Sequence, residues 1–149
     1  MMFKESPPLK LGDTFLNLHL WVVCTLPDSA GSVVAINFTT KRSDSDDSCV
    51  IHAGEHPFVS HDSVLAYDRA RVWDTKTQQA ILNLGDECQR NASVRDVLIS
   101  RIQAGGLKSP HLSPKMKGMI RDSMAAQAND KVAPQRNNSI SKLRMKSRW

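Results

Sequence analysis

Two apolar, β-branched runs separated by a single turn constrain the fold of this chain more than any other feature. The first run covers residues 18–25 and the second covers residues 33–40. Between them, residues 27–32 contain proline, aspartate, serine and glycine, a composition typical of a turn. The sequence therefore predicts a β-hairpin with a connection of about six residues, close to common loop lengths.

Two further strand segments extend the β pattern. Residues 41–48 contain no hydrophobic residue, which predicts an exposed loop, and residues 49–52 follow as a short strand. Residues 63–73 alternate with a period of two, which predicts a strand with a bulge or a strand end near Leu65 and Asp68. No β-α-β alternation occurs over this part of the chain, and this disfavours a doubly wound parallel sheet.

The hydrophobic period becomes helical after residue 90. Ser93 is a candidate N-cap, and Gly105-Gly106 is expected to end the helix. The helical spacing is carried by Val94, Val97, Leu98, Arg101 and Ile102. A second helix is predicted over residues 113–127, and the polar chain from residue 129 onward is expected to be disordered.

These elements predict a mainly β fold with a C-terminal helix, namely a small, partly open β-barrel followed by a basic disordered tail. A split β/α sheet is the competing architecture. The expected organisation is a barrel plus helix over residues 1–104 and a basic tail over residues 105–149.

The net charge of +5 is divided unevenly along the chain. Residues 1–100 contain nine Lys or Arg and thirteen Asp or Glu, whereas residues 101–149 contain eleven and two. A basic segment of this kind suits a polyanion such as nucleic acid, anionic lipid or an acidic protein. Its strongest candidates for nucleic-acid contact are Lys142, Arg144, Lys146 and Arg148; the alternative is a solvated tail that confers solubility.

Cysteine usage and hydropathy indicate the compartment. Cys24, Cys49 and Cys88 form no C-x-x-C pair and are expected to be reduced thiols. The longest apolar run, residues 20–24, is too short to span a bilayer. We therefore expect an unexported cytoplasmic protein with no membrane partner. No cofactor is expected, because no glycine lies in a phosphate-loop frame.

The β-patterned part resembles a known family. Gly12-Asp13, the apolar strand around residues 21–23, the run over residues 34–40 and the segment over residues 63–68 are similar to the PemK/MazF-type toxin domain. The resemblance spans roughly residues 10–104. It implies an SH3-like barrel, encoded by a prokaryote or phage, that cuts RNA without a metal and is neutralised by an antitoxin.

The resemblance also locates a site. In the family, an arginine on the strand aligned with residues 63–68 stabilises the cleaved phosphate, and Ala66 occupies that place here. Asp68 and the Thr39-Thr40 pair do match the family. The resemblance thus implies that the arginine is missing or is displaced to Arg69.

Metal-independent RNA cleavage needs groups that move protons and groups that stabilise the phosphate. His61 is the candidate acid or base and Arg69 the phosphate stabiliser, because imidazole titrates near neutrality and guanidinium donates two hydrogen bonds to phosphate. The predicted catalytic residues are His56, His61, Tyr67 and Arg69. The predicted substrate-binding residues are Thr39, Thr40, Ser63, Asp68 and Arg71.

Several alternatives remain open. His56-Pro57 is also typical of a turn and His61-Asp62 of a capped loop, and Ser63 lacks the elbow of a serine nucleophile. The ligand-type residues Cys49, His52, His56, His61 and Asp62 match no standard zinc spacing, so no metal is predicted. A non-catalytic nucleic-acid or protein-interaction module is the runner-up function, and a homodimer or an otherwise inert half of a complex is a further possibility.

Overall fold

The computed structural model describes the backbone of residues 9–84 and 89–144, and the side chains of residues 9–84 and 92–129. Seven strands form one sheet within this part of the chain. The strands are β1 (Thr14–Asn17), β2 (His19–Val23), β3 (Val33–Thr40), β4 (Val50–Ile51), β5 (Ser63–Leu65), β6 (Arg71–Trp73) and β7 (Gln89–Asn91). The helices are η1 (Tyr67–Arg69), a 3₁₀ turn, then α1 (Thr75–Asn83), α2 (Asp96–Lys108) and α3 (Pro114–Arg144).

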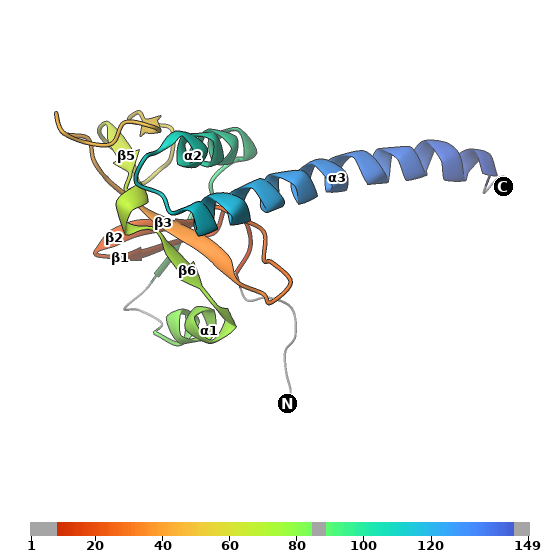
Figure 1. Ribbon diagram of the computed structural model, residues 1–149, viewed down its shortest axis with the longest axis horizontal. Coiled ribbons are helices and arrows are strands. Elements are labelled where there is room, and N and C mark those ends of the chain that lie inside the picture. Colours follow the sequence, from red (N-terminus) through yellow and green to blue (C-terminus); the bar gives the residue numbers. More distant parts are fainter. Residues whose placement is uncertain (1–8, 85–88, 145–149) are drawn as a thin grey trace.

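The sheet is antiparallel throughout its pairings and runs β4-β5-β3-β2-β1-β7. The long strand β3 is shared, because β6 pairs with its first half and β5 with its second half on the same edge. No pairing joins β4 to β7 among the described residues, so the sheet does not close. The predicted fold class is confirmed: the protein is mainly β, a small, partly open barrel with C-terminal helices (Figure 1).

The predicted hairpin is present as β2 and β3, which pair from Trp21–Asn37 to Val23–Ala35. Its connection covers residues 24–32 and is built as a polar turn. The Asp28 carboxylate accepts the backbone N–H groups of Ala30 and Ser32, each at 2.9 Å. Aspartate is frequent in turns because its carboxylate bonds to nearby backbone N–H groups in this way, which is why the composition of residues 27–32 predicted a turn.

Strand β3 is central because its first half is apolar on both faces. Its alternate residues Val34, Ile36 and Phe38 face the main core, and Val33 and Ala35 face a second, smaller core. Residues 33–36 are thus buried on both sides of the sheet, as expected of a strand segment covered on both faces. The main core also takes Leu98, Ile99 and Ile102 from α2, Leu112 from the connection after it, and Ile120 from α3.

Helix α1, which was not predicted, covers the second core. Asp74 caps it by accepting the N–H of Thr77 at 2.8 Å. Ile81 and Leu82 then pack against the group formed by Leu9, Phe15, Val23, Val33, Ala35 and Trp73. Figure 1 shows α1 on one side of the sheet and α2 with α3 on the other.

One sequence prediction is confirmed in part and another needs correction. The strand expected over residues 63–73 has the predicted strand end at Leu65; the chain then forms η1, in which Tyr67 is buried, and continues as β6. Gly105-Gly106 does not end α2 but lies inside it, and the helix begins at Asp96 with Arg95 as its N-cap. Glycine is needed at position 105 because Tyr67 packs closely against the helix there: a β-carbon on Gly105 would lie 2.5 Å from the Tyr67 hydroxyl.

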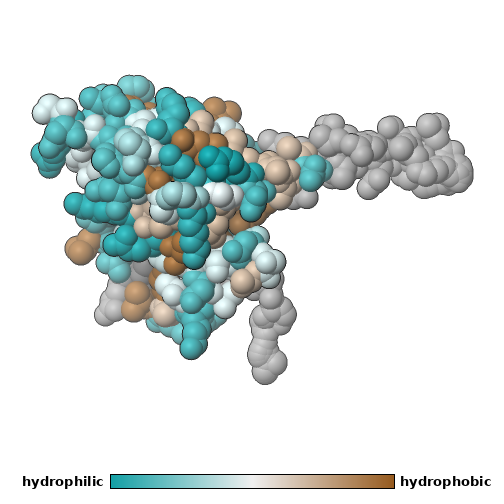
Figure 2. Space-filling view, viewed as in Figure 1, coloured by the Kyte–Doolittle hydropathy of each residue, from teal (hydrophilic) through white to brown (hydrophobic). Residues whose placement is uncertain are grey.

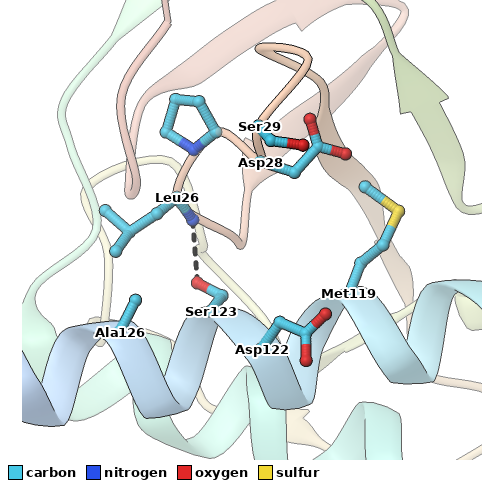
Figure 3. A pocket seen from close by; sticks show the side chains of 8 residues that line it. Leu26, Asp28, Ser29, Met119, Asp122, Ser123 and Ala126 are labelled. Carbon is cyan, nitrogen blue, oxygen red and sulfur yellow. Dashed lines mark hydrogen bonds between the residues drawn. The ribbon is translucent and has the colours of Figure 1, made fainter.

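Helix α3 is fastened to the hairpin and to α2 by a polar network. Ser123 Oγ accepts the N–H of Leu26 at 2.8 Å (Figure 3). The same hydroxyl donates to Gln127 at 3.0 Å. Gln103 of α2 donates to the Cys24 carbonyl at 2.9 Å and to Gln127 at 2.7 Å. These bonds satisfy buried polar groups that would otherwise oppose packing.

The helix predicted over residues 113–127 is therefore present, and the backbone of α3 continues to Arg144, away from the barrel (Figure 1). The boundary expected at residue 104 falls within α2. Because Leu112 and Ile120 belong to the main core, the segment after residue 104 packs on the barrel at least as far as Ser123.

Candidate active site

A polar groove opens where β3, β5 and η1 meet the loop of residues 41–48 and the connection between α2 and α3. We call it the β3–η1 groove; its volume is about 380 Å³. It is lined by Thr39, Thr40, Arg42, Asp44, Ser45, Asp46, Val64, Leu65, Ala66, Asp68, Arg69 and His111. Thr39, Thr40, Asp68 and Arg69 from the predicted site therefore lie together in it.

The backbone around Ala66 explains why Asp68 and Arg69 are exposed while Tyr67 is buried. The Ala66 N–H donates to the Asn37 carbonyl of β3 at 2.8 Å, so β5 stays attached to β3 as far as Ala66. The Arg69 N–H then donates back to the Ala66 carbonyl at 2.9 Å and closes the 3₁₀ turn η1. The turn sends one side chain inward and the next two to the surface.

The groove contains charges of both signs. Arg42 and Arg69 line it together with Asp44, Asp46 and Asp68. Of the three aspartates, Asp46 has two hydrogen bonds from serine side chains. Its carboxylate accepts bonds from Ser48 Oγ at 2.6 Å and from Ser109 Oγ at 2.5 Å. Burial alone would raise the pKa of Asp46, but these hydrogen bonds and the nearby His111 lower it below its ordinary value.

His61 lies at the margin of the groove. Its Nε2 is 3.0 Å from the hydroxyl oxygen of Thr40, which lines the groove, and its Nδ1 is 3.3 Å from Ser60 Oγ. The imidazole is exposed. An exposed imidazole bonded to a groove hydroxyl has access to solvent and to a bound substrate, as an acid or base requires.

Tyr67 does not lie in the groove. Its side chain is only 1% exposed, and its hydroxyl donates to the Ile102 carbonyl of α2 at 2.7 Å. Burial raises its pKa far above the ordinary value of a tyrosine. Tyr67 is a core residue that joins the barrel to α2.

His56 is likewise buried, with 2% of its surface exposed. Its Nδ1 accepts the N–H of Phe58 at 3.1 Å, which leaves Nε2 to donate to the Ala92 carbonyl at 2.6 Å. Both ring nitrogens are thus used within the protein. This geometry is that of a turn residue that ties the segment of residues 56–59 to the chain before α2.

Ser63 and Arg71 lie near the groove but do not line it. The Ser63 hydroxyl is buried and donates to the His61 carbonyl at 3.0 Å, which fits a hydrogen bond that ends a loop. The Arg71 guanidinium, on β6, donates to the carbonyls of Arg69 and Ala70 at 2.9 and 3.1 Å. The structure therefore places Thr39, Thr40, Asp68 and Arg69 in the groove and His61 at its margin, and it places the other predicted residues outside it.

The ligand-type residues near His52 do not converge. His52 Nδ1 lies 3.2 Å from an Asp62 oxygen, as an exposed pair. Among the described side chains, no three His, Cys, Asp or Glu residues gather as metal ligands would. Of the predicted tail residues, Lys146 and Arg148 lie outside the described residues, and only the backbone is described for Lys142 and Arg144.

A larger cavity, of about 480 Å³, lies between the β2–β3 connection and α3 (Figure 3). Its polar groups include two carboxylates, from Asp28 and Asp122, but no cationic or imidazole side chain among the described residues lines it. Ser123, its best placed hydroxyl, is used in fastening α3. The β3–η1 groove is thus the better candidate for chemistry on an anion.

The described residues form no broad apolar patch on the face shown in Figure 2. Hydrophobic residues of the described part appear there as separate patches among hydrophilic ones. Within the same part of the chain, no helix combines the length and the apolar character that crossing a bilayer requires.

Comparisons with known proteins identify no relative, since no protein-family model, curated protein or solved structure matches the chain.

Sequence reasoning missed Arg42 and His111 as groove residues. Arg42 follows Thr40 closely, and its place at the start of a polar loop beside the paired threonines is a signal that was available. His111 had no such signal. It enters the groove only because α2 folds back on the barrel and brings residues 109–113 beside the loop of residues 41–48.

Proposed function

We propose that this chain is a metal-independent endoribonuclease that cleaves RNA in the β3–η1 groove. The observation that carries the proposal is the position of Arg69. Ala66 occupies the place of the family arginine in the resemblance to PemK/MazF-type toxins, and both Ala66 and Arg69 line the groove. A guanidinium is therefore available beside the same wall, displaced by one 3₁₀ turn.

The other groove residues suit the same reaction. Arg69 and Arg42 supply donors for phosphate oxygens, and the hydroxyls of Thr39 and Thr40 supply further hydrogen bonds. His61, bonded to Thr40, is the base that takes the proton from the ribose 2′-OH. His56 and Tyr67 support the fold and are not assigned to the chemistry.

The setting that this activity implies is a toxin–antitoxin-like system of a prokaryote or phage. The enzyme acts on cytoplasmic RNA, and an antitoxin protein that covers the groove restrains it. A homodimer is compatible with this function, and neither partner is needed for the basal reaction.

The test is cleavage of a mixed-sequence RNA by the purified chain in EDTA. We expect fragments with 2′,3′-cyclic phosphate and 5′-hydroxyl ends. A Thr39→Ala/Thr40→Ala double variant purified in parallel controls for contaminating nuclease, and it is expected to lose at least about tenfold in rate, as removal of transition-state hydrogen bonds does. Intact RNA at high enzyme concentration contradicts the proposal.

A non-catalytic nucleic-acid-binding module is the second candidate, and the three aspartates of the groove favour it. Carboxylates beside Arg42 and Arg69 weaken phosphate binding there, so RNA affinity would reside in residues 131–149, which contain six Lys or Arg and no acid. This candidate predicts retarded RNA mobility without new fragments. It also predicts sharply weaker binding at high salt or after removal of those residues.

A further inference from the structure

His111 differs from the other four histidines in coming from the helical part of the chain. It lies in the connection between α2 and α3 and is exposed. It lines the β3–η1 groove together with Arg42, Asp46 and Arg69, which belong to the barrel. The groove is therefore completed by a segment that follows α2, outside the expected barrel-plus-helix unit of residues 1–104.

The connection is held firmly on both sides of His111. Ser109 is fully buried, and its hydroxyl donates to Asp46 Oδ2 at 2.5 Å while accepting the N–H of His111 at 3.0 Å. Leu112, on the other side, is buried in the main core against Gly106. Because Ser109 and Leu112 are both held in this way, the backbone of His111 is held in place at the groove that the residue lines.

Charged groups of both signs line the groove beside His111. Asp46, whose carboxylate is held by Ser48 and Ser109, is close enough to interact with it electrostatically. The other charged groups that line the groove are Arg42, Asp44, Asp68 and Arg69. Three aspartates and two arginines therefore share the lining with His111.

RNA cleavage without a metal requires two proton transfers. A base takes the proton of the 2′-OH, the 2′-oxygen forms a bond to phosphorus, and the bond from phosphorus to the 5′-oxygen breaks. The departing 5′-oxygen must then receive a proton, and the products are a 2′,3′-cyclic phosphate and a 5′-hydroxyl. His61 supplies the base, whereas the buried His56 and Tyr67 have no access to the departing oxygen.

We infer that His111 is the general acid of the β3–η1 groove, which gives its proton to the departing 5′-oxygen. The inference rests on the proposed ribonuclease function and adds the second proton-transfer group to it. It makes the α2–α3 connection part of the active site, and Asp46 and Ser109 the positioning residues that hold His111 there.

The experiment compares two substrates, an ordinary RNA and the same RNA with sulfur in place of the 5′-oxygen at the cleaved linkage. A thiolate departs without protonation, so an enzyme that lacks its general acid still cleaves the second substrate. We expect His111→Ala and His111→Gln to lose about 10²- to 10⁴-fold on ordinary RNA, the usual contribution of a general acid, and less than about tenfold on the sulfur substrate.

His19→Ala is the matched control, because His19 is an exposed histidine on β2 that lies outside the groove. It is expected to cleave both substrates at the wild-type rate. Thermal unfolding of each variant shows that the fold is kept. Wild-type cleavage of ordinary RNA with no loss in His111→Ala overturns the inference alone, and so does an equal loss on both substrates. Failure of the wild type to cleave either substrate overturns the proposed function itself.

Discussion

Gly105 lets the Tyr67 side chain pack directly against the backbone of α2. A β-carbon at this position would lie 2.5 Å from the Tyr67 hydroxyl oxygen, 2.7 Å from the Cys49 β-carbon and 2.9 Å from the Ser48 carbonyl oxygen. Real side chains do not approach so closely. Tyr67 and Cys49 are both buried in the main core, so a shift of α2 away from the barrel to make room would disturb core packing.

Gly105→Ala is therefore expected to lower the free energy of unfolding by about 1–3 kcal/mol, as overpacking of a core does. Gly118→Ala is the matched control, since no atom of the described residues lies within 4 Å of its added β-carbon in α3. That change is expected to be neutral or to stabilise by up to about 1 kcal/mol, through helix propensity. Denaturant unfolding of both variants is the measurement, and equal stability of Gly105→Ala and wild type contradicts the packing.

Cys24 links stability to alkaline pH. It is fully buried in the main core, and burial raises the pKa of its thiol from 9.0 to about 12, against a smaller opposing effect of a backbone hydrogen bond. The unfolded thiol ionises at lower pH than the folded one. Its contribution is therefore fully present below pH 9 and is lost as the pH rises toward 12.

The expected result is that the wild type loses stability between pH 9 and 10.5 more steeply than Cys24→Ala does, by up to about 1.4 kcal/mol per pH unit. Comparing slopes removes the cavity cost of the alanine, which is the same at each pH. Guanidinium unfolding at several pH values in reducing buffer measures both slopes. Parallel slopes would show that the thiol is accessible in the folded state.

Sequence patterns predicted residues well where their environment is local. The alternating residues of β2 and β3 and the Asp28 turn depend on near neighbours, and these were predicted. Tyr67 and His56 were misplaced because their partners, Ile102 and Ala92, are distant in sequence. Nothing near a polar aromatic side chain in the sequence tells whether it meets solvent or a remote carbonyl.

At the scale of elements, helices were harder to predict than strands. The sequence signal for helix α1 is its N-cap, Asp74. Its apolar residues Ile81 and Leu82 pack on the second core, which is formed by residues distant in sequence, so local periodicity does not reveal their role. The end of α2 was misjudged because a glycine pair is typical of a helix end, whereas here it serves close packing. Both errors come from tertiary contacts that override local propensity.

The seating of α3 depends on Ser123, which is 5% exposed and bridges Leu26 to Gln127. We expect Ser123→Ala to destabilise the protein by about 1–2 kcal/mol, because it leaves the Leu26 N–H without its partner. Hydrogen exchange at the Leu26 amide should accelerate in parallel. Ser100→Ala, at an exposed position of α2, is expected to change stability by less than about 0.5 kcal/mol.

Unchanged exchange at Leu26 in Ser123→Ala would mean that α3 is not held on the hairpin by this bond. The result also bears on the groove, because α3 follows the connection that holds His111. Loosening α3 is therefore expected to loosen the α2–α3 connection as well, and with it the His111 side of the groove.

At the scale of the whole molecule, the groove is a product of the complete fold. Its walls come from β3, from β5 with η1, from the loop of residues 41–48 and from the α2–α3 connection. The sequence located the first two walls through the resemblance and the strand pattern. It did not locate the last, because that segment reaches the barrel through the packing of α2 on the main core, a contact between residues distant in sequence.

The central claim is that RNA is cleaved at the β3–η1 groove by means of Arg69. The most direct measurement compares RNA cleavage rates in EDTA for Arg69→Ala and Arg121→Ala, two exposed arginines of which only Arg69 lines the groove. We predict a loss of about 10²- to 10³-fold for Arg69→Ala, as for removal of a transition-state donor, and less than about threefold for Arg121→Ala. Equal rates for the two variants would contradict the account.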